Sequence, residues 1–198
     1  MTPILPVLVS LLLVSCVKTT PITAQKDGSS SSDQTITASA ETTAAAEKPA
    51  EKIKWLTIEQ AAERIKKEPR KVMIDVYTDW CGWCKKMDKD TFTDPEVIAL
   101  MNKYYYAVKL DAEGKAPITL NDHTYTFKPD YRSHELAVAL LQGQMSYPTT
   151  VYLDEKFNML APVPGYLNAK NFAKVLRYFG ENHHKTMNWK EYEKKTGY

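Results

Sequence analysis

The chain has 198 residues, a formal net charge of +2 at pH 7 and only three cysteines. This length allows one domain with a substantial hydrophobic core plus terminal segments. The nearly balanced charge creates no strong electrostatic field, which argues against nucleic acid or a strongly acidic protein as the partner. Three cysteines are also too few for a scaffold that depends on several disulfides.

The first sixteen residues form a short apolar segment that ends in a cysteine. Residues 4–14 are apolar apart from one proline and one serine, and are too short to span a bilayer as a stable helix. The sequence Leu-Val-Ser-Cys at 13–16 resembles the lipobox of bacterial lipoproteins, which implies lipidation of Cys16. No Lys or Arg precedes Cys16, unlike the usual export signal. We expect a lipoprotein signal peptide at 1–16, with a plain signal peptide or a short anchor as the alternative.

Residues 17–52 are rich in Ser, Thr, Ala, Glu and Lys and contain almost no large apolar side chains. Such a segment cannot bury enough surface to offset the entropy lost on ordering. We therefore expect a disordered tether between the lipid anchor and the folded domain. A solvated tail without a role fits the same composition.

Folded structure is expected to begin near Trp55 with a helix and then a buried strand. The run Thr57-Ile58-Glu59-Gln60 forms a capping box, and apolar residues follow at helical spacing until Pro69. Val72 to Tyr77 is apolar except for Asp75, which predicts a central strand from Lys71 to Tyr77.

Two cysteines, Cys81 and Cys84, follow this strand, and the next residues predict a helix to about Asp90. At a helix N-terminus, unpaired N–H groups and the helix dipole favour a thiolate. Such a position can lower the pKa of a thiol from about 8.5 to about 3.5–7.5. The second sulfur is one turn further on, close enough to form a disulfide. The spacing therefore indicates dithiol chemistry.

The cysteine pair has two other interpretations. Half of a zinc site needs a second ligand pair, but the only other cysteine is Cys16 and the four histidines lack the usual spacing. A purely structural disulfide across so short a loop would constrain little of the unfolded chain. If Cys16 carries lipid, the exported protein keeps one closely spaced pair, which favours an exchange catalyst.

The middle of the chain predicts a helix, a strand and a hairpin. Asp94-Pro95 is typical of an N-cap followed by proline at the first helical position. Tyr104 to Leu110 is a second buried strand. Ile118 to Phe127 alternates around Asn121-Asp122, which predicts a β-hairpin, either a functional element or a loop elaboration without function. Ser133 to Gln142 reads as a helix.

The last third predicts two strands and a helix before a C-terminal extension. A strand follows Pro148, and Met159 to Val163 forms the last strand, which two prolines mark as an edge. Asn168 is placed to cap the final helix, which ends near Gly180. Beyond it, Trp189 and Tyr192 share a helical face. This face docks on the domain or contacts a partner.

The residues around the cysteine pair resemble a known family. Asp75 to Lys85 resembles the active-site segment of the thioredoxin superfamily. The following residues, Lys86 to Val97, make the resemblance more specific. They resemble thioredoxin-like domains of the bacterial envelope, including the C-terminal periplasmic domain of the transmembrane thiol:disulfide interchange protein. The resemblance covers about Ile53 to Gly180.

The resemblance implies an α/β fold, a thioredoxin-like three-layer sandwich with a mixed central sheet flanked by helices. A β-hairpin insertion at about 112–130 would precede the cis-proline strand. The expected organisation is a signal peptide at 1–16, a tether at 17–52, the thioredoxin-like domain at 53–180 and a helical extension at 181–198.

The family also implies roles for individual residues. Cys81 would be the accessible attacking thiolate and Cys84 the shielded cysteine that resolves the mixed disulfide. Asp75 matches the buried carboxylate that helps proton transfer from the second cysteine, and its burial should raise its pKa. Lys109 matches the family lysine near that acid, with an ordinary strand-end lysine as the alternative. The residues expected to shape the substrate face are Trp80, Gly82, Trp83, Tyr147, Pro148 and Thr149, with Pro148 cis.

We therefore predict a lipid-anchored thiol–disulfide oxidoreductase of the cell envelope, periplasmic or surface-facing, whose partners are disulfide-containing proteins. Its redox group is the Cys81–Cys84 disulfide, with no other cofactor, no metal and no nucleic acid. A membrane-embedded donor would supply electrons. Gly82-Trp83 lacks the histidine of strongly oxidising relatives, which favours a reductase. The rivals are a disulfide oxidase or isomerase, and a non-catalytic binding module at the cell surface.

Overall fold

The computed structural model describes residues 51–197. Cys16, the predicted signal peptide and the predicted tether up to residue 50 lie outside the described residues. Within 51–197, no helix is both long enough and apolar enough to cross a membrane.

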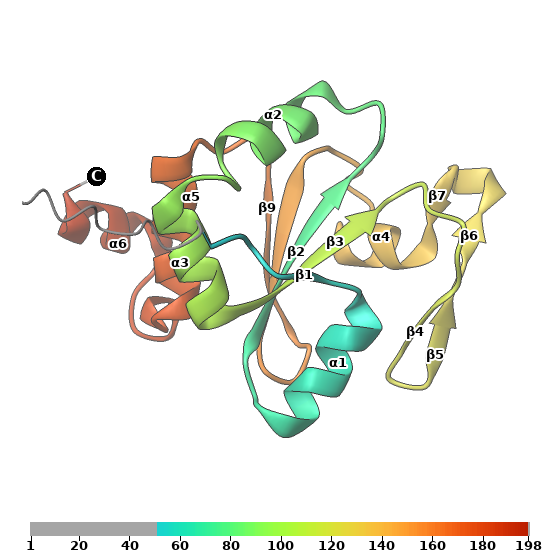
Figure 1. Cartoon of the computed structure of the whole chain (residues 1–198), viewed down its shortest axis with the longest axis horizontal. Helices are drawn as coiled ribbons and strands as arrows, with labels where there is room; N and C mark the ends of the chain where they lie inside the picture. Colours follow the sequence, from blue (N-terminus) through green and yellow to red (C-terminus); the bar gives the residue numbers. More distant parts are fainter. Residues whose placement is uncertain (1–50, 198) are drawn as a thin grey trace, which may run out of the picture. The chain divides into compact units, whose positions relative to one another are not determined.

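A mixed five-stranded sheet forms the centre of the domain, as the resemblance implies (Figure 1). β1 and β2 run parallel to β3, whereas β8 is antiparallel to β2 and β9 is antiparallel to β8. The order places β2 in the middle and β9 at an edge, where its two prolines remove no hydrogen bond from a central ladder. In the order β1-β3-β2-β8-β9, the strands are Trp55–Leu56, Tyr105–Asp111, Lys71–Tyr77, Thr149–Leu153 and Met159–Pro164.

Helices cover both faces of this sheet and complete three layers (Figure 1). Apolar residues of α1 and α4 share one core cluster with one face of the sheet. Residues of α2, α3 and α5 share a second cluster with the other face. Their bounds are Ile58–Lys67 for α1, Glu135–Leu140 for α4, Gly82–Asp90 for α2, Pro95–Tyr104 for α3 and Ala169–Gly180 for α5.

The predicted helix starts are confirmed by their capping contacts. Thr57 and Gln60 form the capping box of α1. The Asp94 carboxylate accepts hydrogen bonds from two backbone N–H groups of α3, and the Asn168 side chain accepts one at the start of α5. Because these caps satisfy otherwise unpaired N–H groups, they fix where each helix begins.

The segment between β3 and α4 contains two small hairpins. β4 (Ile118–Leu120) pairs with β5 (His123–Tyr125) through Asn121 and Asp122, whose φ angles of 51° and 62° suit the expected tight turn. β6 (Phe127–Lys128) leads through η1 (Pro129–Tyr131) to β7 (Ser133–His134). That this segment is an insertion relative to the family stays a prediction.

The predicted start of the following helix was two residues early. Ser133 and His134 pair with β6, so α4 begins at Glu135. The ring of the buried His134 accepts a hydrogen bond from the Leu136 N–H at 3.3 Å and so acts as the N-cap. A strand pair followed by a histidine cap has no clear sequence pattern.

The C-terminal extension docks on α5. It contains η2 (His183–Lys185) and α6 (Trp189–Thr196). Tyr192 is buried, and its ring lies 5.1 Å from the ring of Tyr178 on α5. The Tyr178 hydroxyl donates a hydrogen bond to the Met187 carbonyl at 2.9 Å. The aromatic face predicted for this segment therefore contacts the domain itself.

Candidate active site

Cys81 and Cys84 form a disulfide at the N-terminus of α2. Their sulfur atoms are 2.08 Å apart. Cys81 is the N-cap of α2, and the Cys84 N–H donates to its sulfur at 3.0 Å. The preceding loop is held by a hydrogen bond from the Cys81 N–H to the Thr78 carbonyl at 3.1 Å. The Cys81 sulfur therefore lies after strand β2 at the N-terminus of α2, the positive end of the helix dipole, as the sequence predicts.

The two cysteines do not differ in exposure as the resemblance implied. Cys81 is 4% exposed and Cys84 is 3% exposed. In this disulfide form the Cys81 sulfur turns onto the helix backbone, where it accepts the Cys84 N–H, instead of facing solvent. The expectation of an accessible first cysteine is therefore wrong for this state.

Two exposed tryptophans lie next to the disulfide in the chain. Trp80 is 67% exposed and Trp83 is 59% exposed. The Trp80 ring meets the ring of Tyr147 edge-on, with centroids 5.9 Å apart. The Trp83 ring lies 5.3 Å from the ring of Tyr166, which follows β9. Each tryptophan thus rests on a tyrosine from a different loop, although both remain available to a partner.

The loop before β8 has the predicted geometry. The Tyr147-Pro148 peptide bond is cis. Thr149 is buried, and its hydroxyl donates to the Ser146 carbonyl at 2.8 Å, so this side chain stabilises the loop from within. Gly82 is exposed, and a Cβ atom there would contact nothing within 4 Å.

Asp75 is buried on β2, six residues before Cys81. One of its carboxylate oxygens accepts an ion-paired hydrogen bond from the Lys109 ammonium at 2.7 Å. The other oxygen has no hydrogen-bond partner among the described residues. Burial raises the pKa of Asp75 above its usual range, and Lys109 offsets this only in part.

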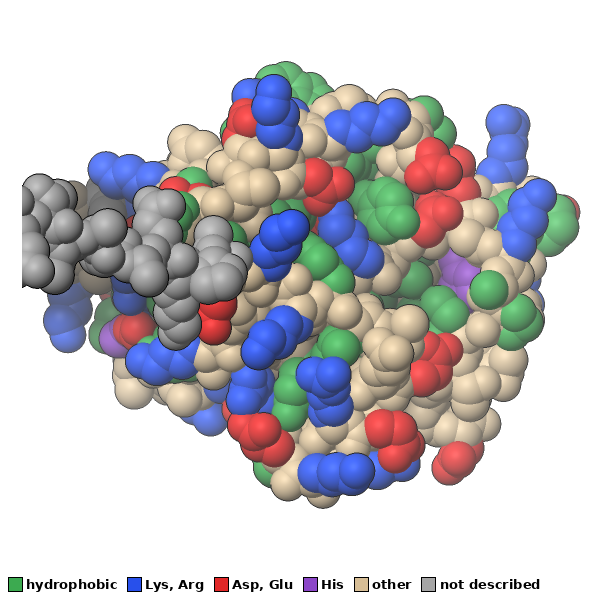
Figure 2. Space-filling view, viewed as in Figure 1, with side chains coloured by type: hydrophobic (Ala, Val, Ile, Leu, Met, Phe, Trp, Pro, Cys, Tyr) green, Lys and Arg blue, Asp and Glu red, His purple; other side chains and the backbone are tan. Residues whose placement is uncertain are grey.

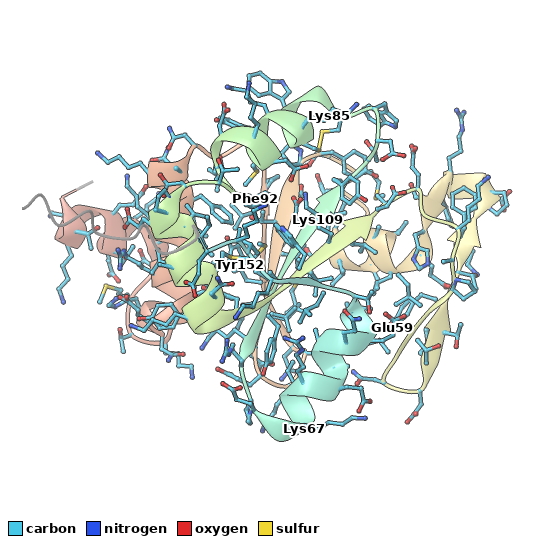
Figure 3. All side chains as sticks on the ribbon, viewed as in Figure 1. Glu59, Lys67, Lys85, Phe92, Lys109 and Tyr152 are labelled. Atoms are coloured by element: carbon cyan, nitrogen blue, oxygen red, sulfur yellow. A yellow bond between two sulfur atoms is a disulfide. The ribbon has the colours of Figure 1, made fainter. Side chains whose placement is uncertain are left out.

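Lys109 connects Asp75 to the active-site helix. It lies opposite Asp75 in the β2–β3 register, and its ammonium also contacts the carboxylate of Asp88 on α2. Its position below α2 and near Phe92 can be followed in Figure 3. Burial alone would lower the pKa of Lys109, but the two carboxylates raise it above its usual range.

Three aromatic rings surround the Lys109 ammonium. The ring centroids of Trp55, Tyr77 and Phe92 lie 5.0, 5.1 and 5.1 Å from its nitrogen. The negative faces of aromatic rings favour a cation at this range. The structure therefore places two carboxylates and three aromatic rings around this one charge, and a catalytic role of Lys109 stays a prediction.

Sequence reasoning missed three residues of this site. Asp88 lies four residues after Cys84 on α2, so helical spacing could have pointed to it. Glu113 accepts a hydrogen bond from the Trp80 indole N–H at 3.0 Å. Tyr166 packs against Trp83. Nothing in the local sequence marks Glu113 or Tyr166, because both reach the site through the fold.

The sequence profile of a family described as "Thioredoxin-like domain" matches residues 58–180. The chain belongs to this family. It is 30% identical over 115 residues to the thiol:disulfide interchange protein DsbD of Pectobacterium atrosepticum, covering 57% of this chain and 17% of that protein. It is also 30% identical over 122 residues to DsbD of Escherichia coli K12, covering 61% of this chain and 18% of the relative.

Among solved structures, the DsbD C-terminal domain of Neisseria meningitidis in the reduced form is 21% identical to this thioredoxin-like protein. The match covers 60% of this chain and 90% of that chain, with a TM-score of 0.41. Family membership together with the Cys81–Cys84 disulfide makes the protein a thioredoxin-like thiol–disulfide oxidoreductase. The match spans less than a fifth of each DsbD relative, so the activity of the whole DsbD protein is not transferred with it.

Proposed function

We propose that this protein reduces or exchanges disulfides of proteins in the cell envelope. The observation that carries the proposal is the Cys81–Cys84 disulfide at the N-terminus of α2. A dithiol in this position can cycle between a disulfide and a thiolate–thiol pair without any other cofactor.

The reaction begins with the reduced pair. The Cys81 thiolate, stabilised by the helix N-terminus, attacks one sulfur of a partner disulfide. An S–S bond forms between Cys81 and the partner, and the second partner sulfur leaves as a thiolate that takes up a proton. Cys84 then attacks the Cys81 sulfur and releases the first partner sulfur. Two electrons have passed to the partner, and the Cys81–Cys84 disulfide is restored.

In the second step Asp75 acts as the base that takes the proton from the Cys84 thiol. Its support is the burial of this carboxylate on the strand that leads to the site, which raises its pKa toward neutrality. The ammonium of Lys109 holds one carboxylate oxygen, and the second oxygen has no partner among the described residues and can accept a proton.

Replacing Asp75 by asparagine is expected to slow the second step about 100-fold near neutral pH, at the lower end of general-base effects. Because the base must be ionised, the wild-type rate should rise with pH through the raised pKa of Asp75, and the variant should lack this rise. Stopped-flow measurement of mixed-disulfide resolution from pH 5 to 9 tests this. Equal profiles for the two proteins would exclude Asp75 as the base.

Asp75→Asn should also change how the free energy of unfolding depends on pH. The pKa of the Asp75 carboxyl group is higher in the folded state than in the unfolded state. Its contribution to stability is therefore fully present below the unfolded pKa and is lost as the pH rises through the folded pKa. Relative to the wild type, the asparagine variant should therefore gain free energy of unfolding as pH increases through this range. Denaturant unfolding at several pH values measures it.

The proposed direction of electron flow is toward the substrate. Trp83 occupies the position where strongly oxidising relatives of this fold carry histidine, which favours a reductase. We further propose that lipid on Cys16 anchors the protein in the envelope and that a membrane-embedded donor reduces the Cys81–Cys84 disulfide. A disulfide between Cys81 and that donor would be the intermediate.

The test of the proposal is to trap partners with Cys84→Ser, in which Cys81 can attack but the mixed disulfide cannot be resolved. Envelope proteins released by reductant after purification of this variant are expected to contain disulfides or dithiols. The double variant Cys81→Ser, Cys84→Ser is the matched control and should trap nothing. Equal recovery from both variants, or no captured protein at all, would contradict exchange.

A further inference from the structure

Trp80, directly before Cys81, is exposed yet held in place. Its indole N–H donates to the Glu113 carboxylate at 3.0 Å, and its ring meets Tyr147 edge-on at 5.9 Å. An unrestrained surface tryptophan would sample several rotamers. Two contacts from separate segments instead give this ring a fixed position beside the disulfide, where a partner must dock.

Both contacts of Trp80 lead to the ends of the segment that carries the small hairpins, residues 112–134, which we name the hairpin segment. Glu113 is its second residue. Near its other end, the side chain of Ser133 lies close to the phenol of Tyr147 and lowers its pKa, against the larger effect of burial. The His134 N–H donates to the Ala112 carbonyl at 2.6 Å and ties the two ends together. The closed base of the hairpin segment therefore supports the wall formed by Trp80 and Tyr147.

Exposed apolar side chains occur both beside the disulfide and in the hairpin segment. Among the described residues, four large hydrophobic side chains are exposed. Two of them, Trp80 and Trp83, flank Cys81, and Met145 lies in the loop that leads to Tyr147. The fourth, Tyr131, is in the hairpin segment itself. Trp80 and Trp83 therefore offer apolar surface to a partner directly beside the disulfide.

The base of this wall is also acidic. Asp79 and Asp111 lie near the phenol of Tyr77. Asp111 and Glu113 lie near the phenol of Tyr147. In both places the negative charges add to burial in raising the pKa of the phenol. In residues 51–197 no cation forms an ion pair with these three carboxylates. Figure 2 shows acidic side chains grouped at the end of β3, beside the loop into α2. An extended partner segment with a positive charge near its cysteine complements this corner.

We propose that the hairpin segment selects the partner of the Cys81–Cys84 disulfide, and that Glu113 is the positioning residue that holds its Trp80–Tyr147 wall. The partner is a polypeptide in which a Lys or Arg and an apolar side chain lie close to the reacting cysteine. This inference rests on the proposed exchange activity and adds its substrate class.

The test uses the full-length chain and three disulfides of known structure. Two peptide disulfides differ only in carrying Lys-Phe or Glu-Phe beside the cysteine, and hydroxyethyl disulfide lacks both features. The wild type should prefer the Lys-Phe peptide by about tenfold in kcat/KM. Glu113→Ala should lose this preference, with kcat/KM falling more for the Lys-Phe peptide than for the Glu-Phe peptide or hydroxyethyl disulfide, while its reduction potential stays unchanged.

A second variant separates charge from positioning. In Glu113→Gln the amide oxygen can still accept the indole N–H, so the tryptophan fluorescence anisotropy of the protein should match the wild type although the charge preference is lost. Asp122→Asn, at the tip of the β4–β5 turn, removes a carboxylate from the same segment and should change nothing. A wild-type rate that is equal for the two peptides overturns the inference, as does a loss in Glu113→Ala that is equal for all three disulfides. Inactivity of the wild type on hydroxyethyl disulfide overturns the exchange activity itself.

Discussion

Cys81→Ser is expected to reduce the turnover of protein disulfides to the uncatalysed background. A serine hydroxyl at this position cannot form the S–S bond on which exchange depends. Continuous assay of a protein disulfide with a chemical reductant measures the loss. Because the Cys84 N–H already faces this position at 3.0 Å, serine should keep the N-cap of α2 and the fold.

The matched control is Cys84→Ser, which should retain the first attack and accumulate the mixed disulfide. The comparison also separates catalysis from the rival binding function. A binding module would keep its biological activity in Cys81→Ser, since the surface around Trp80 and Trp83 stays intact. Retained activity of that variant in cells would therefore contradict the enzymatic account.

Lys109→Met is expected to lower the free energy of unfolding at neutral pH by about 3 kcal/mol, the lower end of losses from breaking a buried ion pair. The lower end applies because the Lys109 side chain is 24% exposed. Methionine keeps contact with the surrounding rings but leaves the buried Asp75 carboxylate without its counter-ion. Denaturant unfolding of both proteins measures the difference.

The pH dependence of that loss identifies its cause. When the pH falls below the pKa of Asp75, the carboxyl group is neutral and needs no cation. The loss of free energy of unfolding caused by Lys109→Met should therefore become smaller. Asp75→Asn combined with Lys109→Met should restore most of the stability at neutral pH. Asp88→Asn is the control, because this carboxylate is more exposed and pairs with Lys109 at the surface of α2. A pH-independent loss would mean that packing, not charge, holds Lys109.

The sequence predicted the framework of the fold because its signals are local. The capping box at Thr57, the Asp94-Pro95 helix start and the apolar run of β2 each depend on neighbouring residues. The cis bond before Pro148 was predicted from the family resemblance instead, since most X-Pro bonds are trans. The structure has the expected disulfide between Cys81 and Cys84 and the expected proximity of Lys109 to Asp75, and the roles of these residues stay predictions.

Other features depend on packing between distant segments, and local sequence carries no sign of them. Glu113 reaches Trp80 across 33 positions of the chain, and Tyr166 meets Trp83 from the loop after β9. The low exposure of Cys81 likewise depends on how the disulfide turns its sulfur onto the Cys84 N–H. These contacts position the residues of the proposed docking surface. The partner preference was therefore less predictable from the sequence than the thiol–disulfide chemistry of the cysteine pair.

The reduction potential of the Cys81–Cys84 pair tests the central claim most directly. The purified protein is equilibrated against glutathione buffers, and the fraction of disulfide is read from the mass change on thiol alkylation, with the double variant Cys81→Ser, Cys84→Ser as the blank. We predict a value near or below about −200 mV, in the thioredoxin-to-glutaredoxin range, where the pair donates electrons and needs a reducing partner. A value near about −120 mV would make the protein an oxidant and would contradict the proposed direction of electron flow.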